Sequence, residues 1–245
     1  MQPKSREIER LVRGYEKFRA KYFNDPQNDL YKTLVKQGQK PKTMVVACSD
    51  SRVDPSILLN SAPGQLFIVR NVANLVPPWD PEVSHDGAKT LHYHGTSAAL
   101  EFAVRDLKVE NLVLLGHSHC GGIRALLKTD NQSKASRAKD FITRWMNIAE
   151  AARKKVFTAC KKQSLEKQAR RCEEEALIVS LKNLLTFPWI AEKVDAGKLQ
   201  LHAWHFDLST GILQGFNPRS NKFEDLKHGA RTRNSPSLRA QRGNP

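Results

Sequence analysis

Three short apolar runs constrain the fold of this 245-residue chain more than any other feature. They are MVVA at 44–47, LFIV at 66–69 and LVLL at 112–115. Continuously apolar runs of this length are typical of strands buried on both faces, as in a parallel sheet covered by helices. Helix-like sequence separates the runs. The order of elements therefore predicts an α/β fold, in which a single domain has a mainly parallel central sheet flanked by helices.

The sequence on either side of these runs predicts three segments. Residues 1–40 carry apolar side chains at helix spacing and are expected to form an N-terminal helical arm that docks on another surface. Residues 41–218 are expected to form the main domain, with an added edge strand after the alternating segment 199–208. Residues 219–245 are basic and have few apolar side chains, so we expect them to be a disordered tail.

The positive charge of the chain is concentrated in two segments. Forty Lys and Arg against 25 Asp and Glu give a net charge of +15, and the pI is near 9.8. Nearly all of the excess comes from residues 128–171 and 219–245. Such a charge suggests a nucleic-acid or anionic-membrane partner, but charge runs confined to a helical face and a tail are usually solvated. We therefore expect no membrane partner and do not expect nucleic acid as the primary one.

The sequence predicts a cytoplasmic protein, because no apolar run approaches the roughly 18 to 20 residues of a membrane helix and the first residues are charged. A disulfide framework is not expected in that compartment. Metal ligation, catalysis or burial remain as roles for the four cysteines, Cys48, Cys120, Cys160 and Cys172. Cys160 and Cys172 lie in charged helical sequence and are interpreted as free thiols.

Two segments with chemically active side chains follow apolar runs directly. CSDSR at 48–52 follows the first run, and GHSHCGG at 116–122 follows the third. In α/β proteins, sites form beyond the carboxyl edge of the sheet. If the two strands are parallel neighbours, Cys48, His117 and Cys120 converge there. Two thiolates and an imidazole suit zinc, and three protein ligands leave a fourth position open, as in catalytic zinc sites.

Four segments of the chain resemble the β-class carbonic anhydrases: CSDSRVDP, FIVRNVANLVPP, HGTSAALEFAVRDLKVENLVLLGHSHCGG and CEEEALIVSLKNLLTFPWI. The resemblance extends from about residue 40 to residue 216. It implies that residues 41–218 are a catalytic domain of that family. It also implies a homo-oligomer, a dimer or tetramer, with active sites at the interface. The implied metal is one Zn²⁺ per chain, bound by Cys48, His117 and Cys120, with Asp50 and Arg52 as catalytic residues beside it.

The resemblance implies a carbonate dehydratase, a zinc lyase that interconverts CO₂ and bicarbonate by attack of zinc-bound hydroxide on CO₂. Zinc lowers the pKa of a bound water from about 15.7 to about 7. Asp50 can accept a hydrogen bond from the hydroxide, and Arg52 can keep that carboxylate ionised and away from the metal. In some family members the equivalent Asp closes the zinc site, so open and closed states both remain for this chain.

Departures from the family pattern indicate a subtype. Some bacterial relatives bind bicarbonate away from zinc through Trp, Arg and Tyr, and the corresponding residues here are Val45, Arg70 and Phe206. Because two of the three are missing, we expect the plant-like subtype without this bicarbonate site. Ala62 stands where plant members have a Gln that contacts substrate, which leaves the shape of the substrate pocket open.

Other histidines are candidates for proton relay, because imidazole titrates near neutral pH. The family leaves the position of His119 free of metal, so we expect it to contact solvent. The relay candidates are His92, His94, His202 and His205.

Other functions are compatible with parts of the sequence. GHSHC at 116–120 resembles the nucleophile elbow of hydrolases, but Cys120 replaces its second glycine and CSDSR is left without a role. A cysteine phosphatase loop needs five residues between Cys and Arg, and this chain has three. Two alternatives remain: a carbon disulfide or carbonyl sulfide hydrolase with the same zinc ligands, and a basic nucleic-acid-binding protein in which zinc is structural.

Overall fold

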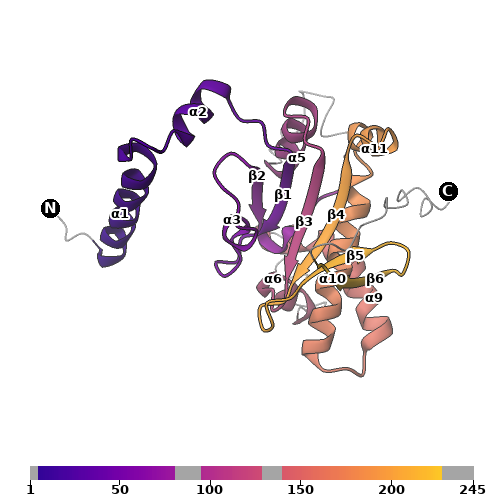
Figure 1. Cartoon of the computed structure of the whole chain (residues 1–245). Helices are drawn as coiled ribbons and strands as arrows, with labels where there is room; N and C mark the ends of the chain where they lie inside the picture. The colour runs from indigo at the N-terminus through magenta and orange to yellow at the C-terminus, as the bar shows by residue number, and fades with distance from the viewer. Residues whose placement is uncertain (1–4, 81–94, 129–139, 228–245) are drawn as a thin grey trace. The chain divides into compact units, whose positions relative to one another are not determined.

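The computed structural model of the chain describes residues 5–80, 95–128 and 140–227 (Figure 1). The chain divides into two compact units, Met1–Lys40 and Pro41–Pro245. Among the described helices, none combines the length and apolar character needed to span a membrane.

A six-stranded sheet forms the centre of the second unit, with the strand order β2-β1-β3-β4-β5-β6. The first four strands in this order are parallel, and β5 and β6 are antiparallel additions at one edge. The mainly parallel α/β sheet predicted from the sequence is therefore confirmed. The strands are β1 (Thr43–Cys48), β2 (Leu66–Asn71), β3 (Asn111–His117), β4 (Gln200–Phe206), β5 (Leu213–Asn217) and β6 (Lys222–Asp225).

The sheet has one edge strand more than the sequence predicted. Strand β6 pairs with β5, and the Phe223 ring packs against Phe216 with ring centroids 5.5 Å apart. The prediction of a disordered tail from residue 219 is therefore wrong for residues 219–227. The sequence of β6 is short and polar apart from Phe223, which is why it lacks the alternation typical of a strand. Residues 228–245 lie outside the described residues.

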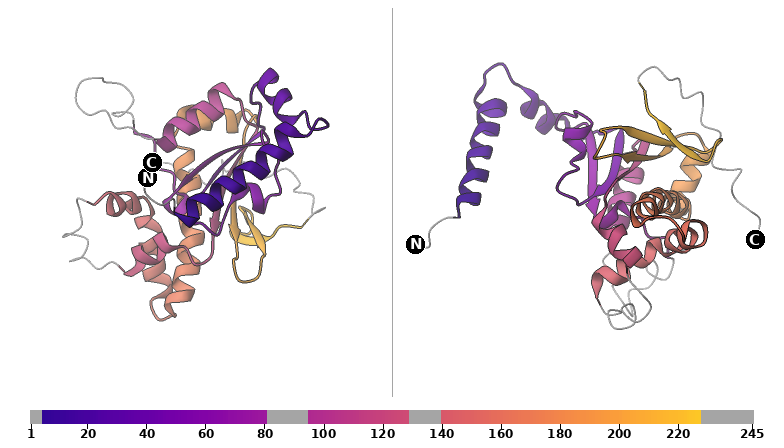
Figure 2. Two further views of the ribbon diagram at one scale, coloured as in Figure 1. Left: turned by 90° about the vertical axis from the view of Figure 1, so that its left-hand side faces the viewer. Right: turned by 90° about the horizontal axis from the view of Figure 1, so that it is seen from below.

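Helices flank the sheet, and Figure 2 shows α9 and α10, the two longest of the described helices in this unit, side by side. Helix α10 also packs along β3 and β4. Single turns of 3₁₀ or π helix occur at Val72–Asn74, Phe102–Asp106 and Asn147–Ala149. The α-helices are α3 (Pro55–Leu58), α5 (Gly95–Glu101), α6 (Gly121–Lys128), α8 (Phe141–Met146), α9 (Glu150–Cys160), α10 (Leu165–Leu184) and α11 (Pro188–Asp195).

Strand β1 contributes to the core on both faces of the sheet. Met44 and Val46 belong to a buried cluster that includes Leu177 of α10. Val45 and Ala47 belong to a separate cluster with Val113, Leu115 and Val53. Successive side chains of a strand point to opposite faces. Because both faces of β1 are covered, every residue of its apolar run is buried, and the run is continuous rather than alternating.

Two glycines near the end of β3 allow close packing. Gly116 lies within β3, which continues through His117. A Cβ at Gly116 would lie 3.0 Å from Cδ1 of Leu177, so the glycine allows α10 to approach the sheet closely. Helix α6 begins at Gly121, directly after Cys120. A Cβ on Gly122 would meet Val72 and Met146.

The first unit is the helical arm. It contains α1 (Arg6–Arg19), a π-helical turn at Ala20–Asn24, and α2 (Leu30–Gln37). The apolar side chains of α1 are between 37% and 60% exposed: Ile8, Leu11, Val12, Tyr15 and Phe18. At its end, rings of Phe18, Tyr22, Phe23 and Tyr31 pack together. The arm thus keeps one apolar stripe exposed within its own unit.

Substituting Gly116→Ala should destabilise the protein by about 1 to 3 kcal/mol, because the added methyl group overpacks the contact with Leu177. Gly95→Ala is the matched control, since a Cβ there meets nothing within 4 Å. The free energy of unfolding of each variant can be measured by urea denaturation. Equal stability of the two variants would contradict the packing role of Gly116.

Candidate metal centre

Three potential metal ligands meet at the carboxyl edge of the sheet. Cys48 is the last residue of β1, His117 is the last residue of β3, and Cys120 directly precedes α6. Strands β1 and β3 are parallel neighbours, as the sequence argument required. The two Sγ atoms and a ring nitrogen of His117 all lie within 4.8 Å of one another, and all three residues are buried. The geometry therefore brings the three predicted ligands together.

The imidazole of His117 is oriented for metal binding. Its Nδ1 lies 2.8 Å from the backbone carbonyl of Ser118. Because a carbonyl only accepts, Nδ1 carries the proton and Nε2 carries the lone pair. The buried Nε2 has no hydrogen-bond partner among the described residues. A buried imidazole nitrogen without a partner, on a ring whose other nitrogen donates to a carbonyl, is typical of metal-ligating histidines.

The two thiols of the cluster perturb each other. A hydrogen bond from Cys120 lowers the pKa of Cys48 to about 4 although burial opposes ionisation. The same pairing with Cys48, followed by burial, raises the pKa of Cys120. One thiolate and one thiol thus share a proton, which a divalent metal would displace. Two sulfurs and one imidazole nitrogen fit zinc with an open fourth position.

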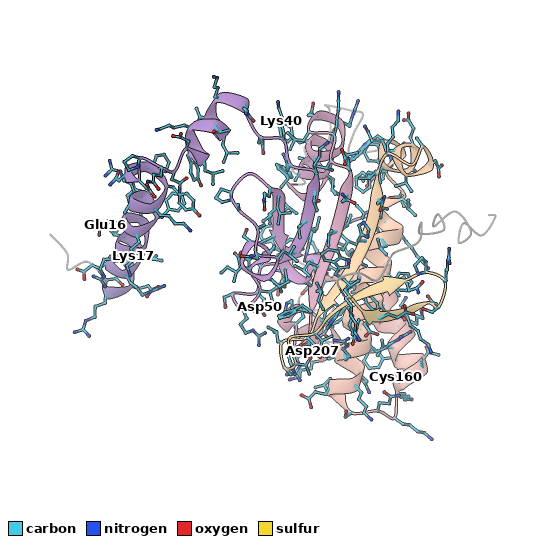
Figure 3. All side chains as sticks on the ribbon, in the orientation of Figure 1. Glu16, Lys17, Lys40, Asp50, Cys160 and Asp207 are labelled. Carbon is cyan, nitrogen blue, oxygen red and sulfur yellow. The ribbon has the colours of Figure 1, made fainter. Side chains whose placement is uncertain are left out.

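Asp50 and Arg52 form a two-pronged ion pair beside the cluster. Nε of Arg52 lies 2.9 Å from Oδ1 of Asp50, and its terminal nitrogen lies 2.7 Å from Oδ2. These bonds hold the pKa of Asp50 well below its usual range. Oδ2 also lies 3.9 Å from Nε2 of His117. The carboxylate, labelled in Figure 3, therefore lies beside the orphaned ligand nitrogen while Arg52 holds both of its oxygens.

Arg70 supports the loop between β1 and α3, a role that the sequence analysis missed. Its guanidinium donates to the backbone carbonyls of Cys48, Asp50 and Val53, at 2.8 to 3.0 Å. It also pairs with the side chain of Asp54, the N-cap of α3. The only local signal was an arginine near the end of a predicted strand, which the structure shows to be the half-buried edge strand β2. Of the two other residues weighed with it, Val45 is a core residue and Phe206 is half-buried.

Glu173 of α10 is a second residue that the sequence analysis missed. Its Oε1 accepts a hydrogen bond from the backbone N–H of Cys120 at 3.0 Å, and its other oxygen lies 3.2 Å from Nε2 of His205. The CEEEAL segment carried family resemblance but did not indicate which glutamate faces the cluster.

The remaining histidines differ in their exposure. His119 is exposed as expected, and its Nε2 lies 3.2 Å from the hydroxyl of Ser209. His205 has no exposed surface, which leaves it no contact with bulk water. His202 is half-buried, and burial lowers its pKa. His92 and His94 lie outside the described residues.

Cys160 and Cys172 are free cysteines on α9 and α10 and are not part of the metal cluster found in the described residues. Cys172 is fully buried, and this burial raises its pKa to about 12. Both residues were interpreted from the sequence as free thiols, and the buried one is a neutral core side chain near neutral pH.

The fold and the site together define a class of protein: an α/β sheet that carries a buried candidate metal site of two cysteines and one histidine at its carboxyl edge. Comparison with known proteins identifies the family within this class. Residues 43–213 match the carbonic anhydrase family. Beta carbonic anhydrase 3 of Arabidopsis thaliana is 40% identical over 206 residues, which cover 84% of this chain and 75% of that protein.

Solved structures agree with the sequence comparison. The structure of the β-carbonic anhydrase CcaA superposes with a TM-score of 0.77 at 32% identity, covering 90% of this chain and 100% of that one. A structure from a study of two tetrameric β-carbonic anhydrases of Sordaria macrospora superposes with a TM-score of 0.65 at 25% identity, covering 85% of this chain and 94% of that one. This chain belongs to the β class of the carbonic anhydrase family.

Proposed function

We propose that this chain is a zinc-dependent carbonic anhydrase that interconverts CO₂ and bicarbonate. Cys48, His117 and Cys120 would hold one Zn²⁺ per chain. The observation that carries the proposal is the buried cluster itself, in which Nε2 of His117 lacks a partner among the described residues and lies close to two thiols. Family membership supports the same activity.

When bound, zinc would make hydroxide available from water near neutral pH, where free water remains protonated. Hydration of CO₂ then requires the hydroxide oxygen to bond to the carbon of CO₂. The product is bicarbonate, and the proton from the original water must leave to buffer. The protein residues beside the cluster would orient the hydroxide and exclude competing ligands.

Asp50 would orient the nucleophile. Its carboxylate is ionised at neutral pH, and Arg52 lowers its pKa further, so it can accept a hydrogen bond but not donate one. A hydroxyl group beside Asp50 would therefore point its proton at the carboxylate and its lone pairs elsewhere. Arg52 binds both carboxylate oxygens and also donates to the carbonyl of His119 at 3.1 Å. These bonds restrain the Asp50 side chain from moving to the metal position.

Zinc binding should depend on the cluster and not on the other cysteines. Cys120→Ser should lose stoichiometric zinc, because a serine hydroxyl is a far weaker ligand than a thiolate. Cys160→Ser is the control and should retain one zinc per chain. Metal content can be measured by mass spectrometry after gel filtration in the presence of a weak chelator. Full zinc content in Cys120→Ser would refute the ligand assignment.

Asp50→Asn should retain zinc but lose about 10²-fold in the rate of CO₂ hydration, because the amide presents a donor where the hydroxide needs an acceptor. Stopped-flow assays on preparations of equal zinc content would measure this loss. Glu110→Gln, which changes an exposed ion pair with Lys42, is the control and should keep the wild-type rate. A wild-type rate in Asp50→Asn would contradict the orienting role.

Arg52→Ala tests whether Arg52 acts by holding the Asp50 side chain in place or by keeping the Asp50 carboxylate ionised. Without Arg52 the pKa of Asp50 should rise toward its ordinary value of about 3.9, which still leaves the carboxylate ionised at pH 7. If Arg52 acts by position, the variant should lose the same factor in rate at pH 7 and at pH 8.5. A defect at pH 7 that disappears at pH 8.5 would mean that Arg52 acts by keeping Asp50 ionised.

We further propose a homo-oligomer, a dimer or tetramer, with the active sites at the interface. The exposed apolar stripe of α1 supports an interface on the arm, and the relatives from Sordaria macrospora are tetrameric.

Light scattering should then give two or four times the chain mass of 27.7 kDa. Leu11→Glu combined with Tyr15→Glu should lower that mass. Arg13→Glu combined with Lys17→Glu, on the polar face of α1, should not. A wild-type monomer would contradict the proposal.

A further inference from the structure

A buried carboxylate lies directly behind the candidate ligand Cys120. Only 3% of the Glu173 side chain is exposed, and its Oε1 accepts a hydrogen bond from the backbone N–H of Cys120. The bond joins the middle of α10 to the residue that precedes α6. An ionised carboxylate is costly to bury unless several donors satisfy it. The second oxygen of Glu173 therefore needs a donor as well.

His205 of β4 supplies that donor. Its Nε2 lies 3.2 Å from Oε2 of Glu173, and a terminal nitrogen of Arg170 lies 2.6 Å from its Nδ1 and 3.3 Å from Nε2. A guanidinium only donates hydrogen bonds, so the nearer ring nitrogen, Nδ1, must be the acceptor. The proton of the neutral ring is then on Nε2 and is donated to Glu173. The donor and acceptor of each hydrogen bond from Arg170 through His205 to Glu173 are therefore determined.

Arg170 is itself held from several elements. It pairs with Glu174 of the same helix at 3.0 Å and with Asp207 after β4 at 3.6 Å, and it donates to the side-chain oxygen of Gln214 on β5. Figure 3 shows Asp207 and Asp50 at the same end of the molecule, where the parallel strands end. The network therefore connects α10, β4 and β5 to the backbone of Cys120.

The turn before Cys120 has an unusual backbone conformation that its neighbours must hold in place. His119, between the two candidate ligands of this loop, has a φ of 58°, a left-handed conformation that is uncommon for a non-glycine residue. Its carbonyl accepts from Arg52 on one side of the turn. Glu173 binds the next residue from α10. The two contacts thus hold the left-handed turn from two different elements, the loop after β1 and α10.

We propose that Glu173 is a positioning residue for the metal centre, and that His205 and Arg170 fix the carboxylate in turn. By holding the N–H of Cys120, Glu173 would hold Sγ of that residue at the distance and direction that zinc requires. This inference rests on the proposed zinc site. Residues that orient metal ligands typically contribute about 10- to 100-fold to metal affinity.

Glu173→Gln is the most direct test. A glutamine amide offers one acceptor oxygen and one donor NH₂ group, whereas both neighbours of Glu173 are donors. One N–H group of the amide would therefore face either the Cys120 N–H or the Nε2–H of His205. Glu175→Gln is the matched control: it lies on the same helix, its side chain is also 3% exposed, and it pairs with Lys155 and Arg171. The metal cluster does not include Glu175.

Zinc affinity can be measured by competition with a chromophoric chelator on the full chain. Glu173→Gln should bind zinc about 10- to 100-fold more weakly than wild type, and Glu175→Gln should bind it with wild-type affinity. Thermal unfolding of the metal-free forms would measure general destabilisation separately. Wild-type zinc affinity in Glu173→Gln, or an equal loss in both variants, would overturn the inference.

Cobalt substitution adds a readout that a merely structural role would not change. Displacement of Cys120 Sγ should alter the sulfur-to-cobalt charge-transfer bands in Glu173→Gln and leave them unchanged in Glu175→Gln. If Glu173→Gln does not fold, His205→Gln should show a smaller loss of zinc affinity with the same spectral trend, and wild-type affinity and spectrum there would overturn the inference. A wild-type chain that binds no zinc would instead refute the proposed function on which the inference rests.

Discussion

Parallel pairing of β1 with β3 is the interaction on which the rest of the site depends. In this register Ala47 lies opposite Leu115, so both strands end at the same edge of the sheet, with Cys48 and His117 as their last residues. Side chains packed on both faces of β1 hold this pairing in place. The site therefore takes its rigidity from the apolar core, which the short runs of the sequence encode.

Three arginines donate hydrogen bonds to polar groups at this edge. Arg52 binds the carboxylate of Asp50, Arg70 binds three backbone carbonyls of the loop after β1, and Arg170 acts on Glu173 through His205. Because an arginine is always protonated and only donates, each of these contacts fixes the direction of its hydrogen bonds. The candidate ligands are thus supported from the side of β1 and from the side of α10.

The parts of the structure that could be predicted from the sequence have local signals. The apolar runs indicated the strands, and the position of Cys48 and His117 directly after them indicated where the two residues would meet. Strand β6 could not be predicted because its polar sequence depends on β5 for pairing. Glu173 lies 53 residues from Cys120, and nothing in its neighbourhood distinguishes it from Glu174 and Glu175. The role of Gly116 likewise depends on a distant side chain, Leu177.

The proposed function requires the Cys48, His117 and Cys120 cluster to hold a zinc ion that supports the hydration of CO₂. The most direct test is a stopped-flow assay of CO₂ hydration at pH 7 and pH 8.5. It would use one preparation with measured zinc content, assayed as purified, after removal of zinc and after its return. We expect rapid hydration with one zinc per chain, loss of the rate when the metal is removed, and recovery when zinc is restored. A zinc-loaded protein that hydrates no CO₂ at either pH would contradict the proposed function and point to hydrolysis of carbon disulfide or carbonyl sulfide.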